Sequence, residues 1–325
     1  MTKMKVLWAV DALAEDKDLQ KKTIAALKSI NRHDSMDIEP IYIMGSDQAR
    51  LTDSVFPVQL GPTRGEVEEK FRAWTRKTKV PGLKSSTILV ASDLSLRTAV
   101  KSLLDYARST KVDLIVASTL ARKGATRFLL GSFAETLMLR SEIPVFLIQP
   151  KAVISSAKKR TILFPTDFSE KSKLALDSVV QLAKANNAGV TLFHQVEFIT
   201  PYTIDPLNTA PLYRNYVARD IKEREKVAKE WGERLKFQGI TAEVVVNTKA
   251  SYPTDAILAY AKKTKPLFLA MASQSGPILS HFIGGVARQV VRQSPCPVWI
   301  VHPVTKSELE QSHEPMALSQ GRVII

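Results

Sequence analysis

The sequence predicts an α/β protein made of two similar, doubly wound parallel sheets in tandem. The chain has 325 residues, too many for a typical single domain and enough for two of about 150 residues each. Segments of the two halves repeat at a constant spacing, and apolar runs of strand length alternate with segments of helical periodicity. Such alternation predicts parallel strands joined by right-handed crossovers.

The internal repeat rests on segments that share one register. Three pairs fit a common offset of 153 residues: 131–138 with 284–291, 143–148 with 296–301, and 114–117 with 267–270. Three matches at one offset indicate a duplicated unit.

In the first half, the short apolar run at 6–10 is typical of a buried parallel strand. A helix is expected at 18–30. Apolar residues from Leu96 to Ala107 recur at helical spacing and predict another helix, and a third is expected to begin near Ser132. The remaining expected strands are 39–44, 86–91, 114–117 and 145–148.

The second half repeats this order. The expected strands are 162–165, 190–194, 242–246, 267–270 and 298–301, and the expected helices are 172–185, 212–237 and 254–262. The predicted domains are therefore residues 1–150 and 160–303, joined by a linker at 151–159 that is poor in apolar residues and followed by a polar tail at 304–325.

Several motifs resemble those of the universal stress protein family. Residues 161–172 resemble its first strand and Pro-Thr-Asp turn, 191–194 its second strand, and Gly131-Ser132 with 294–298 its carboxyl-terminal signature. The resemblance extends over nearly all of both halves. It implies adenine-nucleotide-hydrolase-like sheets with strand order 3-2-1-4-5. It also implies a pseudo-dimer within the chain, in which Val145–Ile148 pairs with Val298–Val301.

Many members of that family bind ATP at a loop of pattern G-x2-G-x9-G-[S/T]. Glycines let the backbone approach phosphate, and the helix that follows offers free N–H groups. In the first half, Ser118 and Ala121 occupy the leading glycine positions before Gly131-Ser132. Two cations in the same loop, Lys123 and Arg127, are expected to offset part of that loss.

The second half departs further from the ATP pattern. The offset of 153 places Met271 and Gln274 at the leading positions, whereas a slip of one residue places Ala272 and Ser275 there. Neither register restores a glycine, and the helix opens with Gly284 and Gly285 in place of Gly-Ser/Thr.

An aspartate follows the first strand of each half, as Asp11 and Asp167. In the family this aspartate lies near the adenine, and here only the second copy has the full context, with Pro165 two residues before it. The alternative interpretation is structural, with Gly131-Ser132 as a helix cap and Asp167 as a turn former. For the second half we favour the structural interpretation.

The formal net charge of +14 predicts attraction to anions but identifies no partner. Phosphate compounds, nucleic acid, anionic lipid and acidic proteins all fit this charge. The single cysteine, Cys296, excludes a disulfide framework and fits a reducing compartment. Since no apolar run reaches membrane-spanning length, a cytoplasmic location is expected.

The sequence therefore predicts a non-enzymatic stress-response binding protein with a degenerate ATP loop. No metal-ligand spacing or catalytic motif is present in the sequence. The alternatives left open are an ATP-binding switch in the first half, with at most slow hydrolysis, and a binder of an anionic ligand such as lipid or nucleic acid. ATP is the one cofactor implied, and two such chains can pair further as a homodimer.

Overall fold

The computed structural model describes residues 3–10, 16–32, 34–45, 64–93, 95–119, 132–196, 210–272 and 285–301. The strands of these residues form one ten-stranded sheet in the order β3-β2-β1-β4-β5-β10-β9-β6-β7-β8. Each half of that order reads 3-2-1-4-5, which confirms the predicted topology.

The strands lie close to their expected positions. Their bounds are β1 (Met4–Ala9), β2 (Met36–Gly45), β3 (Thr87–Ala91), β4 (Leu114–Ser118), β5 (Val145–Ile148), β6 (Thr161–Pro165), β7 (Gly189–Gln195), β8 (Ala242–Asn247), β9 (Phe268–Ala272) and β10 (Val298–Val301). Within each half, the paired strands run parallel.

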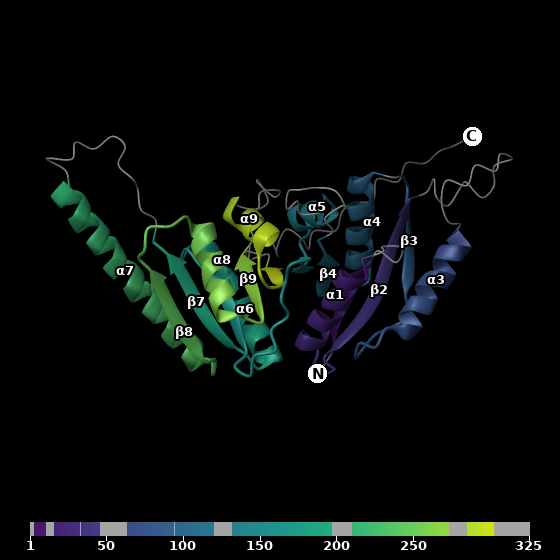
Figure 1. Ribbon diagram of the computed structural model, residues 1–325, viewed down its shortest axis with the longest axis horizontal. Coiled ribbons are helices and arrows are strands. Elements are labelled where there is room, and N and C mark those ends of the chain that lie inside the picture. Colours follow the sequence, from purple (N-terminus) through teal and green to yellow (C-terminus); the bar gives the residue numbers. More distant parts are fainter. Residues whose placement is uncertain are drawn as a thin grey trace, which may run out of the picture.

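Helices cover both faces of the sheet (Figure 1). They are α1 (Lys17–Ile30), α3 (Arg64–Lys77), α4 (Leu96–Ser109), α5 (Ser132–Arg140), α6 (Glu170–Asn186), α7 (Ala210–Phe237), α8 (Pro253–Thr264) and α9 (Gly285–Gln293). The apolar residues of α1, α3, α6 and α7 share one core, and those of α4, α5, α8 and α9 share the other. Both cores run through the two halves without interruption, so the halves form one hydrophobic unit.

The halves meet through β5 and β10, the single antiparallel pair in the described sheet. Val145 pairs with Ile300 and Leu147 with Val298, around a central pair of Phe146 and Trp299. At the repeat offset of 153 these outer pairs are equivalent, so a pseudo-twofold axis passes between the two aromatic residues. Their ring centroids lie 5.2 Å apart.

The strand pairing corrects one part of the predicted repeat. β1 pairs Val6 with Leu114, and β6 pairs the equivalent Ile162 with Phe268. The offset between β4 and β9 is therefore 154, and the assignment of 114–117 to 267–270 at 153 was wrong by one residue. Apolar runs of similar composition do not fix a register, whereas the hydrogen-bonded ladder does.

Helix α3 has no counterpart among the predicted elements. Val67, Phe71 and Trp74 lie at helical spacing on it, and Val67 and Phe71 are fully buried. Arg72, Arg76 and Lys77 are exposed on the same helix.

The segment between the halves contacts its surroundings along its length. The amide of Val153 donates to the carbonyl of Pro295 at 2.8 Å, and the Ser155 hydroxyl donates to the carbonyl of Lys265 at 2.9 Å. Lys22 of α1 also donates to the carbonyl of Pro150. The predicted linker at 151–159 is therefore an ordered connection, while the expected tail at 304–325 lies outside the described residues.

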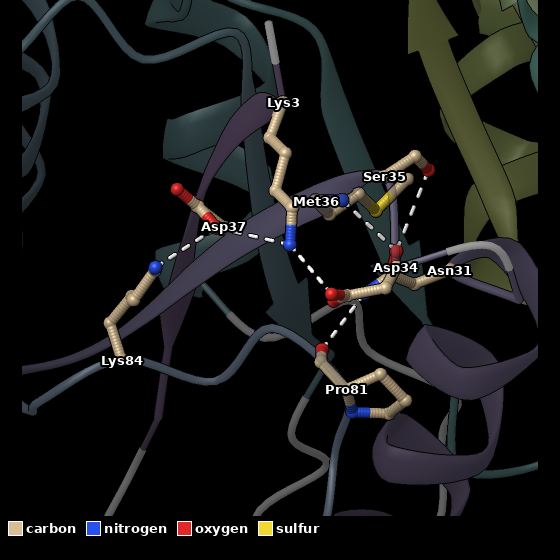
Figure 2. A network of polar contacts seen from close by, with 8 residues as sticks. All are labelled: Lys3, Asn31, Asp34, Ser35, Met36, Asp37, Pro81 and Lys84. Atoms are coloured by element: carbon tan, nitrogen blue, oxygen red, sulfur yellow. Dashed lines mark hydrogen bonds and ion pairs between the residues drawn. The ribbon is translucent and has the colours of Figure 1, made fainter. Parts of the chain in front are cut away.

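A polar network fixes the turn between α1 and β2 (Figure 2). The buried Asn31 accepts a hydrogen bond from the amide of Met36 at 3.0 Å and donates to the carbonyl of Pro81 at 2.8 Å. Lys3 pairs with Asp34, and Lys84 pairs with Asp37. One buried amide thus holds the start of β2 against the loop that leads into β3.

Candidate functional site

The predicted site residues lie at the carboxyl edge of the sheet, where open α/β folds bind ligands. Ser118 ends β4, Ser132 begins α5, Pro165 ends β6, and Gly285 begins α9. Asp167 follows β6 after one intervening residue, Thr166. The other predicted residues lie outside the described part of the chain: Asp11, Ala121, Lys123, Arg127, Gly131 and Gly284.

The topology separates these residues into two sets. β1 and β4, which carry the first set, are neighbours, and β6 and β9, which carry the second, are also neighbours. Strands β5 and β10 lie between the two sets. The predicted residues therefore form two separate candidate sites, one in each half.

The corrected register assigns the leading positions of the second-half loop. Ser118 pairs with Ile148, and Ala272 pairs with the equivalent Val301. Ala272 is thus the counterpart of Ser118, and the assignment of Met271 to that position is wrong. Met271 is instead a buried strand residue. The loop from β9 to α9 is one residue shorter than the loop from β4 to α5, since 273–284 stands where 119–131 stands in the first half.

Gly285 stands at the first position of α9. Among the described residues, no atom lies within 4 Å of a Cβ built on it. The described part of the chain therefore gives no steric reason for a glycine at this helix start.

The carboxylate of Asp167 stabilises the start of α6. One of its carboxylate oxygens accepts from the amide of Ser169 at 2.9 Å and from the hydroxyl of Ser172 at 2.7 Å. Burial acts to raise the pKa of Asp167, but the hydrogen bonds from Ser172 and Ser169 outweigh it and hold that pKa below its usual value. These bonds are those of a turn former at a helix start.

The same motif recurs where no ligand site was predicted. Asp93 precedes α4, accepts from the amide of Ser95 at 2.6 Å and accepts from the hydroxyl of Thr98 at 3.0 Å. Both sites read Asp-x-Ser-x-x-Ser/Thr, and both serines cap their helices. The hydrogen bonds of Asp167 are therefore explained by helix capping alone.

An aromatic cluster lies beside Asp167. Phe168 has its ring centroid 5.0 Å from that of His194 and 5.3 Å from that of Trp231. Its φ of 60° is left-handed, a conformation that costs a side-chain-bearing residue roughly 1 kcal/mol. The turn is secured by the amide of Phe168, which donates to the Thr166 hydroxyl at 3.0 Å. This phenylalanine is not among the predicted site residues, although its place next to Asp167 was a signal.

His194 is a buried histidine with a hydrogen-bonded ring nitrogen. Its Nδ1 lies 2.8 Å from the carbonyl oxygen of Thr166, which can only accept, so Nδ1 carries a proton. Burial lowers the pKa of His194. The neutral ring therefore bridges β7 and the turn after β6.

The described residues contain few groups suited to other chemistry. Cys296 is buried, and burial raises its pKa to about 12, which keeps the thiol protonated and unreactive. Within the described ranges, no group of three or more His, Cys, Asp or Glu residues is placed to hold a metal ion. None of the helices in those ranges is long and apolar enough to span a membrane.

The fold defines an α/β protein of the doubly wound class. The model of the universal stress protein family matches residues 76–149 and 159–302, more than half of the chain. The chain belongs to the universal stress protein family. The match in the first half is narrower than expected, since it begins at residue 76 and leaves out β1, α1 and β2.

A curated relative agrees with this assignment, and two solved structures share the fold. A universal stress protein of Thermus aquaticus is 27% identical over 143 residues, which cover 44% of this chain and 98% of the relative. The crystal structure of a universal stress protein from Archaeoglobus fulgidus superposes with a TM-score of 0.60 at 17% identity, covering 92% of this chain and 98% of that one. A Pseudomonas aeruginosa protein of unknown function gives a TM-score of 0.59 at 10% identity, with 93% of each chain covered. The two structural matches show that the tandem architecture extends across both halves.

Proposed function

We propose that this tandem universal stress protein is a non-enzymatic regulatory binding protein of the stress response whose ATP site is degenerate. The proposal rests on the residues of the second-half candidate site, which are arranged for structure. Its aspartate, Asp167, is hydrogen-bonded at the start of α6, and the neighbouring Phe168 packs on His194. Strand β9 ends in Ala272, at the position where the family's ATP pattern has its first glycine. A rigid pseudo-dimer with a continuous core fits a protein that presents surfaces to partners, among them a second copy, an acidic protein or an anionic ligand. A cytoplasmic location is part of this proposal.

A nucleotide switch in the first half is the second candidate. Ser118 is small and half-buried at the end of β4, and Gly131-Ser132 keeps the family's Gly-Ser pair at the start of α5. A helix start of that kind favours phosphate. In this case ATP would bind in the first half alone.

Equilibrium dialysis with labelled ATP separates the two candidates. For a degenerate site, we expect binding that weakens steeply between about 20 mM and 150 mM salt, because only the general positive field attracts the nucleotide. Binding that persists at the higher salt and is lost in Gly131→Val would contradict the proposal and establish the switch. Lys222→Glu, on the exposed surface of α7, is the control for a change of charge.

A further inference from the structure

Two cavities, both open to solvent, lie at the opposite edge of the sheet, where the strands begin. One has a volume of about 540 Å³ and is lined by Lys28, Asn31, Arg32, Lys79, Val80 and Pro81. The other has a volume of about 410 Å³ and includes Lys159, Arg160, Lys184, Asn187 and Gly239 in its lining. Each cavity thus carries three cationic side chains.

The cavities occupy equivalent places in the two halves. Lys28 and Lys184 lie in the last turns of α1 and α6, and Asn31 and Asn187 are the residues that end these helices. Both pairs are related by 156 residues, the offset that relates β1 to β6. The duplication has therefore placed a basic cavity at the same position in each half.

Arg160 joins the two cavities. Its Nε donates to the carbonyl of Asn186 at 3.0 Å, and its terminal nitrogen donates to the carbonyl of Ser29, next to Lys28, at 2.8 Å. Burial lowers the pKa of Arg160, and the nearby charge of Arg32 lowers it further. Cations of the two cavities therefore lie close enough to repel each other.

Most of the positive charges at this edge have no carboxylate partner. Lys28, Arg32, Lys79, Lys159 and Lys184 are exposed and pair with no carboxylate of the described residues. The neighbouring carboxylates Asp34 and Asp37 already pair with Lys3 and Lys84 (Figure 2).

Helix ends do not account for this many cations. The carboxyl-terminal ends of α1, α3, α6 and α7 border the cavities, and each such end carries roughly half a negative charge. Together they offset about two of the six positive charges. The excess raises the local concentration of anions and favours a ligand that brings several negative charges at once.

We propose that the two cavities form one site for a small ligand with several phosphate groups, which contacts cations of both halves. Neither lining includes an aromatic residue on which a base could stack, which favours a phosphate chain over nucleic acid. The site lies at the edge opposite the family's nucleotide loop, so it is independent of ATP binding in either half.

The test is calorimetric titration of the full chain with inorganic tripolyphosphate at about 150 mM salt. The variant Arg32→Glu with Lys184→Glu changes one exposed cation in each cavity and leaves the structural Arg160 in place. We expect its affinity to fall by at least about tenfold. Each single substitution is expected to cause part of that loss, and orthophosphate is expected to bind far more weakly than tripolyphosphate.

The matched control is Lys222→Glu with Lys226→Glu on α7, which changes the net charge equally at two exposed positions outside both linings. The control is expected to keep most of the affinity. Equal losses in the two variants, or no binding by the unmodified chain, would overturn the site. Tighter binding of single-stranded oligonucleotide than of tripolyphosphate would overturn the proposed ligand class. Circular dichroism checks that each variant is folded.

Discussion

At the scale of single residues, the Asp-x-Ser-x-x-Ser/Thr motif shows that Asp167 has a structural role in helix capping. The aspartate of the family's Pro-Thr-Asp turn was a natural candidate ligand because it follows the first strand. Its hydrogen bonds to Ser169 and Ser172 have direct counterparts around Asp93, which begins α4. A sequence motif that serves two helices alike is therefore weak evidence for nucleotide binding at one of them.

Replacement of this carboxylate gives the first prediction. Asp167→Ala removes two hydrogen bonds at the start of α6 and is expected to lower the free energy of unfolding by about 1 kcal/mol. Because its folded pKa is depressed, Asp167 stabilises the protein above its unfolded pKa, about 3.9, and loses that contribution as the pH falls through the folded value. Urea denaturation should show a full difference from wild type above about pH 5 that shrinks below about pH 4. A difference that does not change with pH would contradict this account.

Two glycines test how the backbone limits substitution. Gly82 has a φ of +72°, and a Cβ there would lie 1.9 Å from the carbonyl oxygen of Met36. Gly239 has a φ of +79° with nothing within 4 Å of its Cβ position. Gly82→Ala is expected to cost at least about 2 kcal/mol of stability, and Gly239→Ala about 1 kcal/mol. Thermal denaturation of the two variants measures the difference, and equal costs would mean that the turn at Gly82 can move.

At the scale of elements, nearly all strands were predictable because buried parallel strands read as short apolar runs. Helix α3 was missed because its buried face is narrow. Val67, Phe71 and Trp74 stand among many charged residues, so the apolar periodicity of this segment is weak. The register of β9 was missed by one residue for a different reason, since its apolar residues are interchangeable and only the pairing with β10 and β6 fixes their positions.

The role of α3 in the core can be measured. Phe71 is fully buried, with its ring stacked on Trp74 at 5.8 Å between centroids. Phe71→Ala is expected to lower the free energy of unfolding by about 3–5 kcal/mol. Arg76→Ala, on the exposed face of the same helix, is expected to change it by less than about 0.5 kcal/mol. Similar effects of the two changes in urea denaturation would show that α3 adds little to the core.

At the scale of the whole molecule, the family resemblance implied that the two halves pair through their last strands, and the pairing of β5 with β10 confirms it. The candidate site was less predictable. Its leading residues follow from motif spacing, but the capping role of Asp167 depends on hydrogen bonds. The basic cavities combine cations that lie between Lys28 and Lys184 in the sequence. Such a cluster is created by the topology and has no local sequence signature.

The interface between the halves also carries a charge pattern. Glu135 of α5 lies 3.4 Å from Nε of Arg288 and 3.1 Å from a terminal nitrogen of Arg292, both on α9. Glu135 and Arg288 are equivalent positions of the repeat, separated by 153 residues. Two second halves paired in the same way would bring arginines together, and two first halves would bring glutamates together. The opposite charges therefore favour pairing of a first half with a second half.

Charge reversal across this interface provides the last prediction. Glu135→Arg would place three arginines together at half-buried positions, and we expect a loss of at least about 2 kcal/mol of stability. Adding Arg288→Glu and Arg292→Glu to that variant restores opposite charges with the helices exchanged, and should recover at least about half of the loss. Glu135→Gln is the neutral control and should fall between wild type and Glu135→Arg. Because the interface lies within one chain, stability is read from urea denaturation, and sedimentation shows whether Glu135→Arg opens the pseudo-dimer to a second chain. If the triple variant were no more stable than Glu135→Arg, packing of β5 on β10 would determine the pairing of the halves without help from charge.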